Sequence, residues 1–153
     1  MTIMIRKPSL ADFSQWTILW RAYLAFYESE SVADEISELL WQRIHSLKNP
    51  IRCLVAQDSE DKQLVGFVHF LNHSDTWKSN DVCYLEDLFV THDVRGKGVG
   101  ATLIKAVHQQ AIENEWDKVY WHTKHDNKQA RVLYDKLTGG TDGFITYRLA
   151  IKK

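Results

Sequence analysis

The chain has 153 residues, 44% hydrophobic and 25% charged, and its 19 Lys and Arg residues nearly balance 20 Asp and Glu residues. This length suits one domain, so we expect residues 1–153 to form a single one. The near-neutral charge argues against a protein built mainly to bind nucleic acid. No apolar run approaches the ~20 residues that cross a bilayer, so no membrane span is expected. The two cysteines, Cys53 and Cys83, are too few for a disulfide framework and predict buried thiols in a cytoplasmic protein.

The predicted elements follow a mixed order along the chain. Strands are expected at 3–6, 51–57, 63–71, 82–90, 118–123 and 144–151, and helices at 10–27, 33–47, 98–115 and 127–137. Ser9 is a predicted N-cap, with Asp12 three residues later in a capping-box arrangement. The resulting order, βααβββαβαβ, predicts a mixed α/β (α+β) domain with one central sheet.

The strongest functional signal is the segment 90–100, VTHDVRGKGVG, between a predicted strand and a predicted helix. Glycines at every second position let the backbone curl so that several N–H groups point into one concavity. The following helix adds its positive N-terminal end, so the turn suits a phosphate group. The spacing Gly-x-Gly-x-Gly matches neither the Walker pattern nor the dinucleotide fingerprint.

The pattern Arg-x-x-Gly-x-Gly, starting at Arg95, resembles the acyl-CoA pyrophosphate loop of the GCN5-related N-acetyltransferase (GNAT) superfamily. Residues 84–90, YLEDLFV, look like the central strand of its polyamine-acetylating branch, which includes the spermidine/spermine (diamine) acetyltransferases. They are also similar to the yeast histone-and-polyamine acetyltransferase. Residues 127–134, NKQARVLY, look like the family's Asn-x-x-Ala-x3-Tyr helix. The similarity is specific over about residues 82–137 and looser before them.

The resemblance implies a GNAT fold with a splayed sheet, and acetyl-CoA as a cosubstrate lying between strands 84–90 and 118–123. The exposed edge of a strand suits an extended ligand, because its N–H and C=O groups are unpaired. The residues implied to bind the cofactor are Leu88, Phe89 and Val90 for the pantetheine arm, Arg95, Gly96, Lys97, Gly98, Val99, Gly100 and Ala101 for the pyrophosphate, and Asn127 and Ala130 of the helix motif.

Two catalytic residues are expected. Tyr134 matches the family's general acid, which protonates the departing CoA thiolate. Glu86 is the candidate base that takes a proton from the acceptor amine, directly or through water. A structural carboxylate is an equal alternative for Glu86, since it lies in an otherwise apolar strand. Alternation along that strand predicts that Glu86 and Asp87 lie on opposite faces of the sheet and differ in role.

The acceptor side is predicted from an acidic segment. Residues 28–38 contain five carboxylates and no basic residue, which favours a cationic amine; a solvated helix face is the alternative for most of them. Tyr27 and Glu28 match in position the polyamine-contacting residues of the resembled branch. With Glu86 and Asp87 they form the predicted substrate-binding set. No histidine or cysteine spacing is typical of a metal site, and the chemistry proposed needs no metal.

The sequence thus predicts an acetyl-CoA-dependent N-acetyltransferase that acetylates a primary amine by direct attack in a ternary complex. The acceptor is expected to be a small, polyamine-like cation, with a small amino acid or thialysine-like amine, an aminoglycoside and a protein lysine as alternatives. A non-catalytic acyl-CoA-binding or sensing module is the second hypothesis, and a nucleotide-binding protein the third. The resemblance also implies a homodimer in which the last strand takes part, although the connection from Tyr134 to Gly143 is long for the family pattern.

Overall fold

The computed structural model describes all of residues 1–153. Its elements are β1 (Ile3–Arg6), the 3-10 helix η1 (Leu10–Asp12), α1 (Phe13–Phe26), α2 (Asp34–Ile44), β2 (Arg52–Asp58), β3 (Leu64–His73), β4 (Val82–Val90), the 3-10 helix η2 (His92–Val94), α3 (Val99–Glu113), β5 (Val119–Tyr120) and α4 (Lys128–Thr138). The chain divides into two compact units, Met1–Trp121 and His122–Lys153. The expectation of a single domain over the whole chain stays a prediction.

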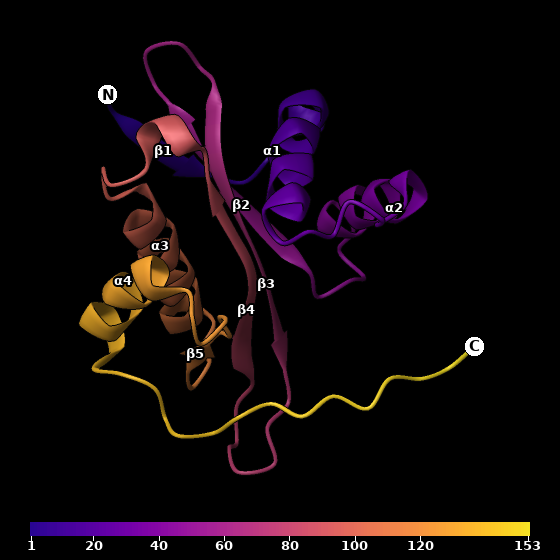
Figure 1. The fold of residues 1–153 in the computed structure, drawn as a ribbon, viewed down its shortest axis with the longest axis vertical. Helices are drawn as coiled ribbons and strands as arrows, with labels where there is room; N and C mark the ends of the chain where they lie inside the picture. The colour runs from indigo at the N-terminus through magenta and orange to yellow at the C-terminus, as the bar shows by residue number, and fades with distance from the viewer. The chain divides into compact units, whose positions relative to one another are not determined.

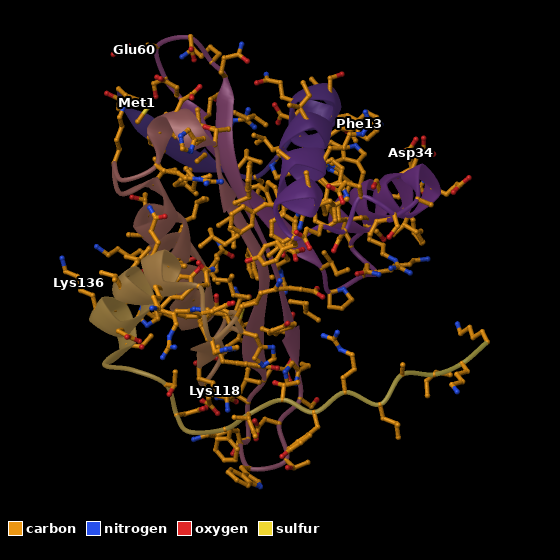
Figure 2. The ribbon with its side chains drawn as sticks, viewed as in Figure 1. Met1, Phe13, Asp34, Glu60, Lys118 and Lys136 are labelled. Carbon is orange, nitrogen blue, oxygen red and sulfur yellow. The ribbon has the colours of Figure 1, made fainter.

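The first unit is built on a five-stranded sheet in the order β1-β2-β3-β4-β5. The first four strands are antiparallel neighbours, whereas β5 runs parallel to β4. Helices α1 and α2 cover one face of the sheet and α3 covers the other (Figure 1). Met1 and Glu60 lie at one end of the sheet and Lys118 at the other (Figure 2). This arrangement confirms the predicted mixed α+β class with a sheet flanked by helices.

Aromatic side chains dominate the core between α1, α2 and the sheet. The buried residues of this cluster are Trp16, Leu19, Trp20, Leu24, Trp41, Cys53, Val55, Leu64, Phe67 and Phe89. The spacing of Trp16, Trp20 and Leu24 places them on one face of α1, so the helix turns a single apolar stripe toward the sheet. On the opposite face of the sheet, α3 buries the apolar side chains of Val99, Leu103, Val107 and Ala111. Burial of each large apolar side chain contributes about 1.5–3 kcal/mol to folding.

The first helical segment begins where the sequence predicts. The backbone N–H of Ser9 donates to Asp12 Oδ2 at 2.7 Å, and the capping box is present. Arg6 donates to both oxygens of Asp12, at 2.7 and 3.0 Å. These bonds lower the pKa of Asp12 below its usual value, the Arg6 hydrogen bond being the largest cause. The segment that these bonds surround is the 3-10 helix η1, which directly precedes α1.

The predicted strand at 144–151 is wrong, since these residues form no strand. Their alternating apolar residues, Phe144, Ile145, Tyr147, Leu149 and Ile151, are all exposed. A strand needs a neighbouring strand for its backbone hydrogen bonds, and α4 is the only regular element in the second unit. The strand predicted at 118–123 is shortened to Val119–Tyr120 because its pairing with β4 ends there.

Candidate active site

The glycine turn between η2 and α3 has an open backbone concavity. Gly96 and Gly98 have φ values of +78° and +82°, a conformation that L side chains rarely adopt. A Cβ at either position would meet no atom within 4 Å, so the space above the turn is free. Gly98 is also the N-cap of α3, and buried Val99 anchors the first turn of that helix. An open turn at the positive end of a 15-residue helix fits a polyphosphate group.

Arg95 is held beside the end of β4. Its Nε–H donates to the carbonyl oxygen of Val90 at 3.0 Å. Its guanidinium also lies 5.5 Å from the ring centre of Phe26 and 5.6 Å from that of Phe89. Within the guanidinium group, only the Nε–H takes part in the bond to Val90. Arg95 therefore connects the glycine turn with β4 and with the end of α1.

The edge of β4 that faces β5 opens after two residues. The parallel ladder joins Cys83 with Val119 and Tyr84 with Tyr120 and goes no further. From Leu85 to Val90, β4 has a strand neighbour only on its β3 side. The sheet is thus splayed at this point, and the backbone edge at Leu88–Val90 leads into the glycine turn. Unpaired strand edges accept extended ligands.

A β-bulge interrupts β4 at Glu86. His69 of β3 pairs with Asp87 and Phe70 pairs with Leu85, which leaves Glu86 as the extra residue. The prediction that Glu86 and Asp87 lie on opposite faces assumed an unbroken strand, and the bulge removes that basis. Glu86 is exposed. Its pKa is nevertheless raised, first by partial removal from water and then by the charge of Asp87.

Asp87 lies within a chain of hydrogen bonds that the sequence did not predict. The hydroxyl of Tyr23 donates to Asp87 Oδ1 at 2.7 Å, and His69 Nδ1 lies 2.9 Å from Asp87 Oδ2. The indole N–H of Trp16 donates to His69 Nε2 at 3.1 Å. Burial, followed by the charge of Asp87, raises the pKa of Tyr23, so its phenol remains a donor. The feature of the sequence that pointed to this network is a single histidine, His69, within the apolar run 64–71, LVGFVHFL.

Tyr27 and Glu28 follow the end of α1 beside this network. Tyr27 is the half-buried C-cap, with its ring centre 5.0 Å from that of Tyr23. Glu28 is exposed and has a φ of +53°, a position where helices usually carry glycine. No basic residue lies within 28–38 of the sequence. In the folded structure, however, one carboxylate of this segment has a basic partner, because Arg21 Nη2 lies 3.5 Å from Asp34 Oδ1. Asp34 lies at the start of α2 (Figure 2).

The second unit carries the Asn-x-x-Ala-x3-Tyr motif on α4. Asn127 is the N-cap of this helix, and its side-chain N–H donates to Thr123 Oγ1 at 3.1 Å. Ala130 and the half-buried Tyr134 lie three and seven residues further along, so all three occupy one face of α4. Their roles in cofactor binding and acid catalysis stay predictions.

The fold is shared with solved structures of known proteins. A solved structure of this fold, the ribosomal-protein-alanine N-acetyltransferase from Brucella melitensis biovar Abortus 2308, superposes with a TM-score of 0.80 at 23% identity, covering 99% of this chain and 100% of that chain. The family model described as "Acetyltransferase (GNAT) family" matches residues 14–139. The chain therefore belongs to the GNAT acetyltransferase family.

Curated relatives agree with this assignment. The D-amino-acid N-acetyltransferase HPA3 of Saccharomyces cerevisiae is 34% identical over 140 residues, which cover 92% of this chain and 86% of the relative. The thialysine N-epsilon-acetyltransferase of Bos taurus is 31% identical over 143 residues, covering 88% of this chain and 82% of the relative. The chain is accordingly an N-acetyltransferase of a family that uses acetyl-CoA.

Two predictions from the sequence concern membrane spans and metal sites. None of the helices has the length and apolar character required to cross a membrane. No group of three or more His, Cys, Asp or Glu side chains is arranged to hold a metal ion. That the reaction needs no metal stays a prediction, which rests on the chemistry of direct acyl transfer.

Proposed function

We propose that this N-acetyltransferase transfers the acetyl group of acetyl-CoA to the primary amine of a small, polyamine-like cation. The observation that carries the proposal is the Asp87 carboxylate, which lies between the bulge at Glu86 and the strand edge expected to bind the cofactor. Aromatic Tyr23 and Tyr27 lie beside it, and exposed Glu28 follows. Carboxylates combined with aromatic faces favour a cationic amine.

The cofactor half of the proposal follows the fit of the glycine turn. The pyrophosphate binds the backbone N–H groups of the turn, with Arg95 and Lys97 supplying charge. The pantetheine arm pairs with the open edge at Leu88–Val90, and Asn127 adds a side-chain amide. A backbone N–H near Leu88 or Phe89 polarises the thioester carbonyl. The free space above Gly96 and Gly98 supports this assignment.

The chemical step is direct acyl transfer. An alkylammonium with a pKa near 10.4 is mostly protonated at neutral pH, so it must first lose a proton. Glu86 accepts that proton, directly or through water, and its raised pKa suits this task. The amine nitrogen then attacks the thioester carbon, and the carbon–sulfur bond breaks as the nitrogen releases its extra proton to solvent and the amide forms. Tyr134 donates a proton to the departing CoA thiolate and regains one from solvent.

An amino-acid acceptor is the second candidate, and the curated relatives favour it. The two relatives described above are named for acetylating D-amino acids and thialysine. Both compounds offer a primary amine on a small molecule that also carries a carboxylate. Aminoglycosides and protein lysines remain the less favoured alternatives, and a non-catalytic acyl-CoA sensor remains the alternative to an enzyme.

A homodimer in the cytoplasm completes the proposal. The exposed apolar side chains at 144–151 support the dimer, because contact with a second copy would remove them from water. Both cysteines are free and buried, which supports a reducing compartment. Burial raises the pKa of Cys83 to about 12, so its thiol is inert.

The experiment that tests the proposal is a panel of acceptors with acetyl-CoA, followed by release of CoA and by the mass of the product. The panel contains spermidine, lysine and thialysine, D-amino acids, an aminoglycoside and a histone peptide. We expect the highest kcat/KM for spermidine. A higher value for the amino acids would establish the second candidate instead. Tight binding of acetyl-CoA with no turnover of any amine would establish the sensor.

A further inference from the structure

The Asp87 carboxylate is held at both oxygens by donors from two different elements. Tyr23 of α1 donates to Oδ1, and His69 of β3 lies at hydrogen-bond distance from Oδ2. The His69 side chain is 2% exposed, whereas that of Asp87 is 15% exposed. The carboxylate therefore has an inner side fixed by the protein and a small outer part that reaches solvent.

The hydrogen bond from Trp16 determines which nitrogen of His69 carries the proton. An indole N–H can only donate, so His69 Nε2 must accept and has no hydrogen. The ring is then neutral, its proton is on Nδ1, and Nδ1–H donates to Asp87. Aromatic rings enclose the imidazole, with centroids at 5.8 Å for Trp16, 5.4 Å for Trp20 and 4.5 Å for Phe67. The geometry thus favours a single tautomer in a single orientation.

This tautomer leaves the charge of Asp87 uncompensated. A protonated imidazole would neutralise the carboxylate, but a neutral one supplies a hydrogen bond without a positive charge. The ordinary alternative is a buried network that only stabilises the fold. Well-packed apolar residues usually stabilise a core as well as a buried polar pair does, so stability alone gives little reason for this one.

We propose that His69 is a positioning residue, which holds the Asp87 carboxylate through Nδ1–H so that its free lone pairs bind the ammonium group of the acceptor. The inference rests on the proposed function for the identity of the acceptor. Each carboxylate oxygen accepts two hydrogen bonds, so the bonds from Tyr23 and His69 leave capacity for the ligand. Trp16 has the secondary role of fixing the tautomer of His69.

The first test compares three variants by steady-state kinetics with spermidine. His69→Leu removes the donor, and we expect the KM for spermidine to rise about tenfold with little change in the KM for acetyl-CoA. His69→Asn keeps an amide N–H close to the Nδ1 position and should restore most of the affinity. Ser37→Ala is the control, since it removes the bond from Trp20 Nε1 to Ser37 Oγ, 2.9 Å long and buried in the same core.

Equal losses for His69→Leu and Ser37→Ala, or a parallel rise in the KM for acetyl-CoA, would overturn the proposal. Rescue by His69→Asn that is confined to the KM for spermidine would support it. A purely structural role would change thermal stability in all three variants without this selectivity.

The second test uses wild-type protein and does not require turnover. Long-range proton–nitrogen spectroscopy should show His69 with a hydrogen on Nδ1 and none on Nε2 at neutral pH. Addition of spermidine should then shift the carboxyl carbon resonance of Asp87. The opposite tautomer, a doubly protonated ring or an unmoved Asp87 resonance would each contradict the inference. If spermidine shifts Asp87 but no acetyl transfer occurs, the positioning role stands and the proposed function fails.

Discussion

The Nε–H of Arg95 donates to the carbonyl oxygen of Val90 at 3.0 Å, so the first residue of the glycine turn is tied to the last residue of β4. The same guanidinium lies over the ring of Phe89. The turn and the strand edge are the two parts expected to hold the cofactor. Arg95 therefore keeps these two parts in a fixed relation, in addition to supplying a positive charge.

Substitution of Arg95 by lysine tests this double role. Lysine keeps the charge but lacks the Nε–H that bonds to Val90 and the planar guanidinium that lies over the aromatic rings. We expect Arg95→Lys to raise the Kd for CoA about tenfold, as measured by calorimetry. Arg21→Lys, at an exposed arginine paired with Asp34, is the control and should leave the Kd unchanged. An unchanged Kd for Arg95→Lys would mean that charge alone matters there.

Substitution of Gly98 by alanine should weaken cofactor binding through the backbone. The φ of +82° costs a non-glycine residue about 1–2 kcal/mol, and relief of this strain would turn the N–H groups of the turn away from their ligand. Gly139→Ala provides the matched control, because Gly139 has a φ of +86° at the end of α4 and open space around it. Both variants should lose similar stability in thermal unfolding. Only Gly98→Ala should also lose affinity for CoA, and equal affinities would contradict the assignment of the turn.

Replacement of Glu28 by glycine should stabilise the fold and weaken the binding of spermidine. The φ of +53° at Glu28 is strained for a side chain, so Glu28→Gly should raise the free energy of unfolding by about 1 kcal/mol. Loss of the carboxylate should raise the KM for spermidine several-fold. Glu115→Gly is the control, since Glu115 has a φ of +58° just after α3. It should stabilise equally and leave the KM unchanged; a matching KM effect at both sites would remove Glu28 from the acceptor site.

The pH dependence of the reaction should report the interaction between Glu86 and Asp87. The charge of Asp87 contributes to the raised pKa of Glu86, so Asp87→Asn should lower that pKa. A base works only when deprotonated, and kcat/KM therefore falls on the acid side as Glu86 gains its proton. We expect the acid limb of the profile to move to lower pH in Asp87→Asn. A limb that stays in place would show that Glu86 is not the titrating base.

Much of the fold could be predicted from local patterns. The apolar stripes of α1 and α3 and the turn at Gly96–Gly98 are encoded in short segments, and the structure has them near the expected residues. The strand at 144–151 could not be judged in this way, because alternation shows which residues suit a strand but not whether a partner strand exists. β5 was likewise predicted too long, since its length depends on where β4 diverges from it.

The candidate site was predictable only where it follows a continuous motif. The link between His69 and Asp87 joins residues 18 positions apart, and that from Trp16 to His69 spans 53. Such pairs depend on strand register and on how a helix packs, neither of which is visible in a motif. The bulge at Glu86 is a further example, because one unpaired residue invalidates an argument from alternation.

The measurement that tests the central claim most directly is the rate of CoA release with acetyl-CoA and spermidine, for wild type and for Tyr134→Phe. Loss of the phenolic proton should reduce kcat by about 10²–10⁴-fold while acetyl-CoA still binds. The account predicts wild-type release of CoA in equal amount to acetylated spermidine, and the large loss of kcat in the variant. Binding of acetyl-CoA without release of CoA in the wild type, or equal turnover by Tyr134→Phe, would contradict it.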